Sequence, residues 1–310
     1  MGYSQLISQR HWNLPDKGER ETMREQTFID DIVLKSHIEK ELLANLDGIK
    51  TVFDGGGGAG RFSILLAQRG CQVTHFDISK PMLDKAAELA RAAGVQDRIE
   101  FVEGALEDLS AYSDGAFDLV MSFDAPISYT YPNQEKVIAN LVRICAKRIM
   151  LSVSSRLGSL PYCANPLPKN QFILDDDCDD PWVRSCIEGA QAAVDGFTFN
   201  GAVCEQLWRT GLMGGDAERE AYDRGEAPWP ITYAFMPDEL ERILRQCGVH
   251  DIVLAGPGAF ARTLPREILR KIMRDAEQRA EFLEFCHVYD QNPYVCGMGK
   301  DNLFAKGLVT

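Results

Sequence analysis

The residues best suited to chemistry lie in a glycine-rich stretch that begins at Thr51 and reads TVFDGGGGAGRFSILLAQRG. Side-chain bulk is minimal there, so the chain can turn sharply and present the N–H groups at the start of a helix to a ligand. Two spacings fit. G-x-G-x-x-G, counted from Gly55, matches the dinucleotide fingerprint. D-x-G-x-G-x-G, counted from Asp54, begins with a carboxylate. The glycines alone leave both spacings open.

Two carboxylates flank this loop. Asp77 ends the apolar segment CQVTHFD, where nucleotide-binding sheets place an acidic residue that accepts hydrogen bonds from ribose hydroxyls. Either spacing predicts that role for Asp77. Asp54 distinguishes between the two spacings, because a carboxylate directly before the glycines would repel the pyrophosphate of a dinucleotide. Arg61 is the only cation nearby that could compensate. A ligand with sulfonium and ammonium groups is favourable there electrostatically.

Alternating strands and helices must position these residues. Apolar segments predict strands, and periodic or capped segments predict helices. The expected strands are 51–53, 71–77, 99–102, 117–123, 148–153, 251–256 and 302–309. The expected helices are 28–46, 61–68, 79–94, 134–146 and 237–248, with a further helical stretch over 264–290. The predicted fold class is α/β, a doubly wound, mostly parallel sheet of seven strands, closed by an antiparallel last strand.

The pattern breaks between residues 156 and 234, which carry prolines, cysteines and the acidic run DDDCDD. The segment is too long and too apolar for a structureless linker, so we expect an inserted helical cap. The predicted organisation is an N-terminal helical lid over 1–49, a ligand-binding domain formed by 50–155 with 235–310, and the cap over 156–234.

Four motifs stand in order in the first half of the chain: VFDGGGGAG, THFDIS, FVEGALEDL and FDLVMSFDAP. This series resembles the class I (Rossmann-like) S-adenosylmethionine-dependent methyltransferases. The resemblance spans about a third of the chain by motif and implies an S-adenosylmethionine cofactor. A lone glycine loop is weak support, whereas four ordered motifs at strand ends are strong support.

The resemblance also implies roles for individual residues. The loop from Gly55 to Gly58 would line the methionine part of the cofactor, Asp77 would bind the ribose, and Trp12 in the lid would cover the methionine end. The whole set of cofactor-binding residues expected in this way is Asp54, Gly55, Gly56, Gly57, Gly58, Asp77, Ile78, Met82, Leu106, Glu107 and Asp124.

The third motif departs from the family's Gly-Asp-Ala triplet, because Gly104-Ala105-Leu106 stands there. The Asp that reads the adenine amino group is missing at Ala105. Backbone contact from Leu106, or the side chain of Glu107 or of Asp108, could replace it.

Acceptor-site residues are expected just after the fourth strand. Tyr129 and Tyr131 in ISYTYPN are candidate walls of the acceptor pocket. Methyl transfer depends mainly on alignment of the acceptor, and a hydroxyl acceptor also needs a base. His287, beside Tyr289 and Asp290, is the candidate base, with a structural role as the alternative.

Composition limits the partners. The chain has 310 residues and a formal net charge of −13, which disfavours nucleic-acid binding. Its nine cysteines are odd in number and lack a C-x-x-C pair, which favours a reducing compartment. No metal is expected, because DDDCDD lacks the glycine and glutamate of a calcium loop. The sequence carries no apolar signal region and no membrane span, so we expect a cytoplasmic monomer or homodimer.

The sequence thus predicts a methyltransferase that acts on a small molecule, with the methylated O, N or C atom undefined. Three alternatives stay open: methylation of RNA or protein, an NAD(P)-dependent oxidoreductase, and a sensor that binds the cofactor without turnover.

Overall fold

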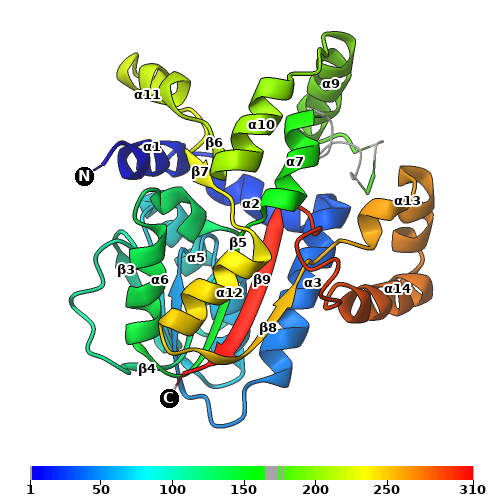
Figure 1. Ribbon diagram of the computed structural model, residues 1–310. Helices are drawn as coiled ribbons and strands as arrows, with labels where there is room; N and C mark the ends of the chain where they lie inside the picture. Colours follow the sequence, from blue (N-terminus) through cyan, green and yellow to red (C-terminus); the bar gives the residue numbers. More distant parts are fainter. Residues whose placement is uncertain (1, 165–173, 176–177, 310) are drawn as a thin grey trace.

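The computed structural model describes residues 2–164, 174–175 and 178–309. Its centre is a sheet of seven strands in the order β3-β2-β1-β4-β5-β9-β8 (Figure 1). All neighbouring strands pair in parallel except β9, which is antiparallel to both β5 and β8. The strands are β1 (Thr51–Gly55), β2 (Gln72–Asp77), β3 (Ile99–Glu103), β4 (Phe117–Ser122), β5 (Cys145–Ser154), β8 (His250–Ala255) and β9 (Asn302–Leu308). The predicted fold class and the antiparallel closing strand are confirmed.

Helices cover both faces of the sheet, because successive strand residues point to opposite sides. Val52 of β1 packs in the cluster with α3 and α4, whereas its neighbour Phe53 packs in the cluster with α6 and α12. Both side chains are fully buried. The covering helices are α3 (Ile29–Ala44), α4 (Arg61–Gln68), α5 (Lys80–Ala92), α6 (Gln134–Arg143) and α12 (Pro237–Gln246).

The N-terminal segment and the segment after β5 lie above the carboxyl ends of the parallel strands (Figure 1). The Arg10 guanidinium stacks 3.5 Å from the ring centroid of Tyr222, and the Tyr3 hydroxyl donates to Asp223, so the two segments contact each other. Their elements are α1 (Tyr3–Trp12), α2 (Lys17–Thr27), α7 (Arg156–Ala164), α9 (Pro181–Asp195), α10 (Gly201–Thr210), β6 (Leu212–Met213), α11 (Asp216–Asp223) and β7 (Thr232–Tyr233).

The excursion between β8 and β9 forms α13 (Arg266–Arg274) and α14 (Ala276–Tyr289). Both pack on α3, where Ile29, Leu269 and Phe282 share one buried cluster. The helical stretch expected over 264–290 is therefore two helices. They separate at Asp275, whose carboxylate accepts a hydrogen bond from the Gln278 N–H and caps α14.

Other differences from the sequence-based expectations are local. Cys145 begins β5 instead of lying in the preceding helix, because α6 ends at Arg143. The segment expected to be helical also holds the short sheet β6–β7. In the acidic run, Asp180 accepts hydrogen bonds from the N–H groups of Trp182 and Val183 at the start of α9, and residues 176–177 lie outside the described residues. Among the described helices none is long and apolar enough to span a bilayer.

Candidate active site

The glycine loop joins β1 to α4 in a conformation that requires glycine. Gly56, Gly58 and Gly60 all have positive φ angles, which L side chains adopt only at a cost. The Gly56 N–H donates to the Phe76 carbonyl at 2.7 Å, which fixes the loop against β2. A Cβ atom on Gly56 would lie 2.5 Å from the Cβ of Pro126. At Gly56 the loop therefore has room for backbone only.

Gly56→Ala should lower the affinity for the expected cofactor at least about tenfold, which corresponds to 1.4 kcal/mol. The added methyl must displace Pro126, which lines the same cavity. Gly70→Ala is the matched control, because Gly70 also has a positive φ but its Cβ would meet no atom within 4 Å. Both variants should lose roughly 1–2 kcal/mol from left-handed strain. Calorimetric titration checks the difference, and equal affinities in the two variants would contradict the steric reading.

A buried polar chain supports the loop from beneath. Ser63 Oγ lies 2.7 Å from Asp54 Oδ2 and 2.9 Å from His75 Nδ1. His75 Nε2 lies 3.1 Å from the Gly58 carbonyl oxygen, which can only accept, so Nε2 carries a hydrogen. Ser63 has one hydrogen and can donate it to only one of these two partners at a time. Neither Ser63 nor His75 was among the predicted site residues.

Asp77 stands at the end of β2, beside the loop. One carboxylate oxygen accepts from the Gly58 N–H at 2.9 Å and the other accepts from the Ser79 N–H at 2.8 Å. Burial raises the pKa of Asp77, and these two N–H donors oppose the rise. Each oxygen keeps a further lone pair for a ligand hydroxyl. Ser79 also donates to the Trp12 carbonyl at 2.8 Å, which ties α1 to the start of α5.

A cavity opens above the loop and Asp77. The space between its walls, open solvent at its mouth included, is about 1010 Å³. Most of the predicted cofactor residues line it together with predicted Tyr129: Asp54, Gly56, Gly57, Gly58, Asp77, Ile78, Met82, Leu106, Glu107 and Asp124. The N-terminal helices α1, α2 and α3 contribute Gln5, Ser8, Trp12, Glu21, Glu25 and Lys35.

Three predicted residues are not among the residues that line this cavity. Gly55 is the last residue of β1, and a Cβ there would meet Phe53 and Leu106 at 2.9 Å. Tyr131 stacks on Tyr233, with ring centroids 6.0 Å apart. His287 lies on α14 and places Nε2 2.9 Å from Glu41 Oε1.

The third motif brings one of its two acidic alternatives to the cavity. Glu107 lines the cavity next to Leu106, and burial raises the pKa of Glu107. Asp108 instead accepts hydrogen bonds from the N–H and the hydroxyl of Ser110. Of the alternatives to the missing aspartate at Ala105, Leu106 and Glu107 therefore have access to a ligand.

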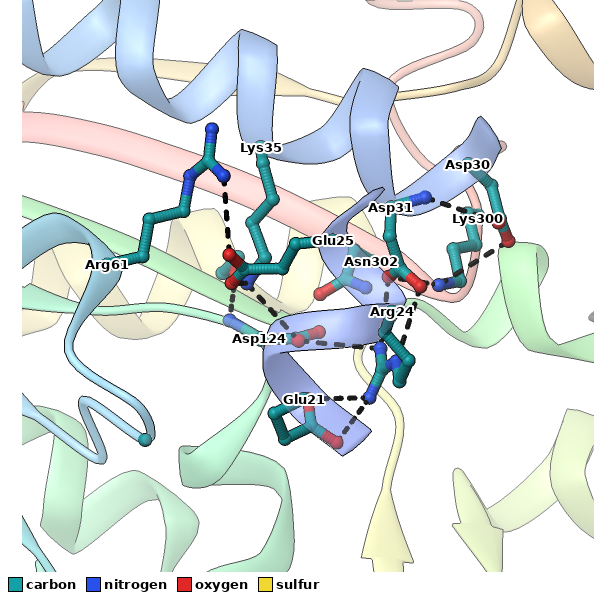
Figure 2. Close-up of polar contacts among 12 residues, drawn as sticks. Glu21, Arg24, Glu25, Asp30, Asp31, Lys35, Arg61, Asp124, Lys300 and Asn302 are labelled. Atoms are coloured by element: carbon teal, nitrogen blue, oxygen red, sulfur yellow. Dashed lines mark hydrogen bonds and ion pairs between the residues drawn. The ribbon is translucent and has the colours of Figure 1, made fainter. Parts of the chain in front are cut away.

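An ion network joins side chains of α2 and α3 to Asp124, which follows β4 (Figure 2). The Arg24 guanidinium forms hydrogen bonds of 3.2 and 3.0 Å with the two Asp31 oxygens, and of 2.9 Å with both oxygens of Glu21. It also lies 3.6 Å from Asp124. Lys35 lies 3.4 Å from the same Asp124 oxygen. Desolvation alone would raise the pKa of Asp124, but Lys35 and Arg24 hold it at about 2, so Asp124 is ionised at neutral pH.

An aromatic compartment adjoins the cavity. Trp12, Asp124 and Tyr129 line both spaces, and the compartment adds Trp229 with Arg24, Ala125, Ser154, Asp301 and Asn302. The Trp12 ring centroid lies 5.8 Å from that of Trp229 and 6.0 Å from that of Tyr129. The space is about 360 Å³, open solvent included. Trp229 was not predicted, because only the folded chain brings it to Trp12.

The residues present fit S-adenosylmethionine. The loop is a cradle that a Cβ atom would fill at Gly56, and Asp77 retains acceptor capacity for ribose hydroxyls. Ile78, Met82 and Leu106 offer apolar contacts for a purine, and carboxylates such as Asp124 suit the cationic end.

The comparisons with known proteins agree with this geometry. Residues 52–148 match a family model described as "Methyltransferase domain". The tRNA 5-carboxymethoxyuridine methyltransferase of Escherichia coli (strain K12) is 39% identical over 70 residues, which cover 23% of this chain and 27% of the relative. The sarcosine/dimethylglycine N-methyltransferase of Halorhodospira halochloris is 32% identical over 127 residues, which cover 40% of this chain and 43% of the relative. The chain thus spans less than half the length of these two curated relatives.

The fold likeness extends over almost the whole chain. The solved structure of the plantazolicin methyltransferase BamL, in complex with a triazolic desmethylPZN analog and SAH, superimposes with a TM-score of 0.51 at 14% identity. The superposition covers 99% of this chain and 96% of that one. Residues 52–148 thus match a methyltransferase domain, and the chain as a whole shares the fold of a solved methyltransferase structure.

Proposed function

We propose that the protein transfers the methyl group of S-adenosylmethionine to a small molecule bound in the aromatic compartment. One observation carries this proposal: Trp12, Asp124 and Tyr129 line both the cofactor cavity and the compartment. Because these residues border both spaces, an acceptor in the compartment would lie next to the cofactor cavity. We further propose that residues 1–49 act as a lid and residues 156–234 as a cap over the acceptor.

The lining of the compartment supports a small acceptor. Trp12 and Trp229 are among its walls, with ring centroids 5.8 Å apart. The rings suit an apolar or planar part of the acceptor. Asn302 offers an acceptor for a polar group, because its Oδ1 has no hydrogen-bond partner. The net charge of −13 disfavours an RNA acceptor.

The reaction asks little acid–base chemistry of these residues. S-adenosylmethionine, when bound, supplies a methyl group already activated by the adjacent sulfonium. The chain's task is to align the acceptor and exclude water, which can contribute several kcal/mol to the barrier reduction. Among the described residues that line the two spaces there is no histidine. His287, the candidate base, bonds to Glu41 instead, so the site favours an acceptor that is nucleophilic without a histidine base.

Trp229→Ala tests the acceptor site. Trp229 lines the compartment but not the cofactor cavity. The substitution should therefore raise the acceptor KM at least about tenfold and leave the affinity for S-adenosylmethionine unchanged. Trp208→Ala is the matched control, because Trp208 is an exposed tryptophan on α10 outside both spaces.

The assay measures formation of S-adenosylhomocysteine with pools of small amines, phenols and carboxylic acids, and in parallel with bulk tRNA and with unfolded protein. The proposal is supported if a small-molecule pool is turned over and if that turnover is lower in Trp229→Ala than in wild type. Turnover with tRNA or protein alone would overturn it.

A further inference from the structure

A cluster of metal-ligating side chains lies outside both spaces described above. His37 and Glu41 are four residues apart on α3 and so share one face of that helix. His287 comes from α14, which packs beside α3 (Figure 1). One donor atom from each residue lies within 4.8 Å of the other two. We propose that His37, Glu41 and His287 form a binding site for a divalent transition metal, with Zn²⁺ as the best fit.

His37 is the observation that points to a ligand. Its side chain is buried, with 3% of its surface exposed, yet neither ring nitrogen has a hydrogen-bond partner. A neutral imidazole ring has one nitrogen lone pair available for a metal ion. A buried polar atom without a partner is unfavourable, and a metal bond would satisfy it.

The donor set is that of a transition metal. Two imidazole nitrogens with one carboxylate oxygen are ligands that Zn²⁺ binds tetrahedrally, at bonds of about 2.0–2.2 Å. Such bonds place donors about 3.3 Å apart. Metal binding would therefore require side-chain rotation: His287 Nε2 and Glu41 Oε1, now 2.9 Å apart, would separate slightly, while donor atoms that lie farther apart would approach. Mg²⁺ and Ca²⁺ prefer oxygen ligands in larger number.

The charges around the cluster are partly balanced before any metal binds. Lys306 lies 2.5 Å from Glu41 Oε2, which leaves Oε1 as the donor. Gln291 Nε2 donates to Oε1 at 3.1 Å, so it can remain as an outer hydrogen-bond partner of that carboxylate. On the other side of His287, Lys40 pairs with Glu284 at the surface.

The site would fasten two segments that are far apart in the sequence. α3 precedes the sheet, and α14 lies in the excursion between β8 and β9. A metal that binds the folded chain stabilises it in proportion to its concentration over Kd. The expected role is structural, because none of the three residues lines the cofactor cavity or the compartment.

The experiment titrates the full chain, freed of metal by chelation, with Co²⁺ in the visible spectrum and with Zn²⁺ by calorimetry. We expect one equivalent bound, a tetrahedral Co²⁺ spectrum, a rise in melting temperature with Zn²⁺, and no competition from excess Mg²⁺. The spectrum should lack thiolate charge-transfer bands. This control is needed because Cys286 adjoins His287 and all nine cysteines are free thiols.

Two variants assign the site. His37→Leu should weaken Co²⁺ binding at least about 100-fold. In the metal-free state it should be no less stable than wild type, because it removes the unpartnered nitrogens. His287→Gln should also lose the metal while keeping a donor for Glu41. His250→Gln is the control, because His250 is a half-exposed histidine on β8 that faces Asp251. Absent Co²⁺ binding, or binding that survives in His37→Leu and His287→Gln, would overturn the proposal.

Discussion

Asp77→Ala is expected to weaken S-adenosylmethionine binding by about 100-fold or more. The variant lacks the carboxylate that would accept hydrogen bonds from two ribose hydroxyls. Hydrogen bonds to a charged group contribute roughly 1.5–3 kcal/mol each. The substitution also removes the acceptor of the Gly58 N–H, which holds the glycine loop beside β2. Asp77→Asn retains one acceptor oxygen and should lose about tenfold. Calorimetric titration of the three proteins measures the series.

Asp108→Ala is the control for this series, because Asp108 is an acid of the same region that contacts Ser110 outside the cavity. Its affinity should equal that of wild type. Burial raises the pKa of Asp77, so wild-type affinity should fall as the pH is lowered through that raised pKa. Asp77→Asn should lack this dependence. Normal binding by Asp77→Ala would show that the ribose does not lie at the end of β2.

Arg24→Met is expected to lower the free energy of unfolding by about 3–5 kcal/mol. The Arg24 side chain is 18% exposed and serves three carboxylates, on Glu21, Asp31 and Asp124. Methionine keeps the aliphatic packing but leaves those carboxylates with fewer cations. Urea unfolding at neutral pH measures the loss. Arg20→Met is the control, because Arg20 pairs with Asp16 at the surface and should change stability by less than about 1 kcal/mol.

The stability difference between wild type and Arg24→Met should depend on pH. Desolvation opposes ionisation of Asp124, but Lys35 and Arg24 depress its pKa to about 2. A depressed carboxylate stabilises the folded state above its unfolded pKa of about 3.9, and that contribution is lost as the pH falls toward the folded value. The stability gap between wild type and Arg24→Met should therefore narrow below about pH 4. A gap that is absent at neutral pH, or that widens in acid, would contradict the role of Arg24.

Local sequence patterns were enough to predict the parts of the site that lie at strand ends. The glycines that follow β1 and Asp77 at the end of β2 were predictable, because a turn into a helix and a ribose acceptor each need a particular residue type at one place in the chain. Ile78 and Met82 follow within a few residues. They line the cavity because the start of α5 faces the loop.

Residues that depend on long-range packing could not be predicted in this way. Arg24 meets Asp124 only because α2 folds back over the end of β4. Trp229 reaches Trp12 across more than two hundred residues of sequence. Tyr131 and His287 had suitable chemistry, but Tyr131 stacks on Tyr233 and His287 faces α3. The type of a residue does not by itself predict which part of the fold its side chain will contact.

Calorimetric titration of the purified protein with S-adenosylmethionine, S-adenosylhomocysteine and NAD in parallel tests the central claim most directly. The claim is that the Asp54-led glycine loop and Asp77 bind S-adenosylmethionine. We expect micromolar binding of the first two ligands and none of NAD, with Asp77→Ala weakening both. Binding of NAD without S-adenosylmethionine would contradict the claim. It would mean that the spacing counted from Gly55 is the functional one and that Asp54 has a different role.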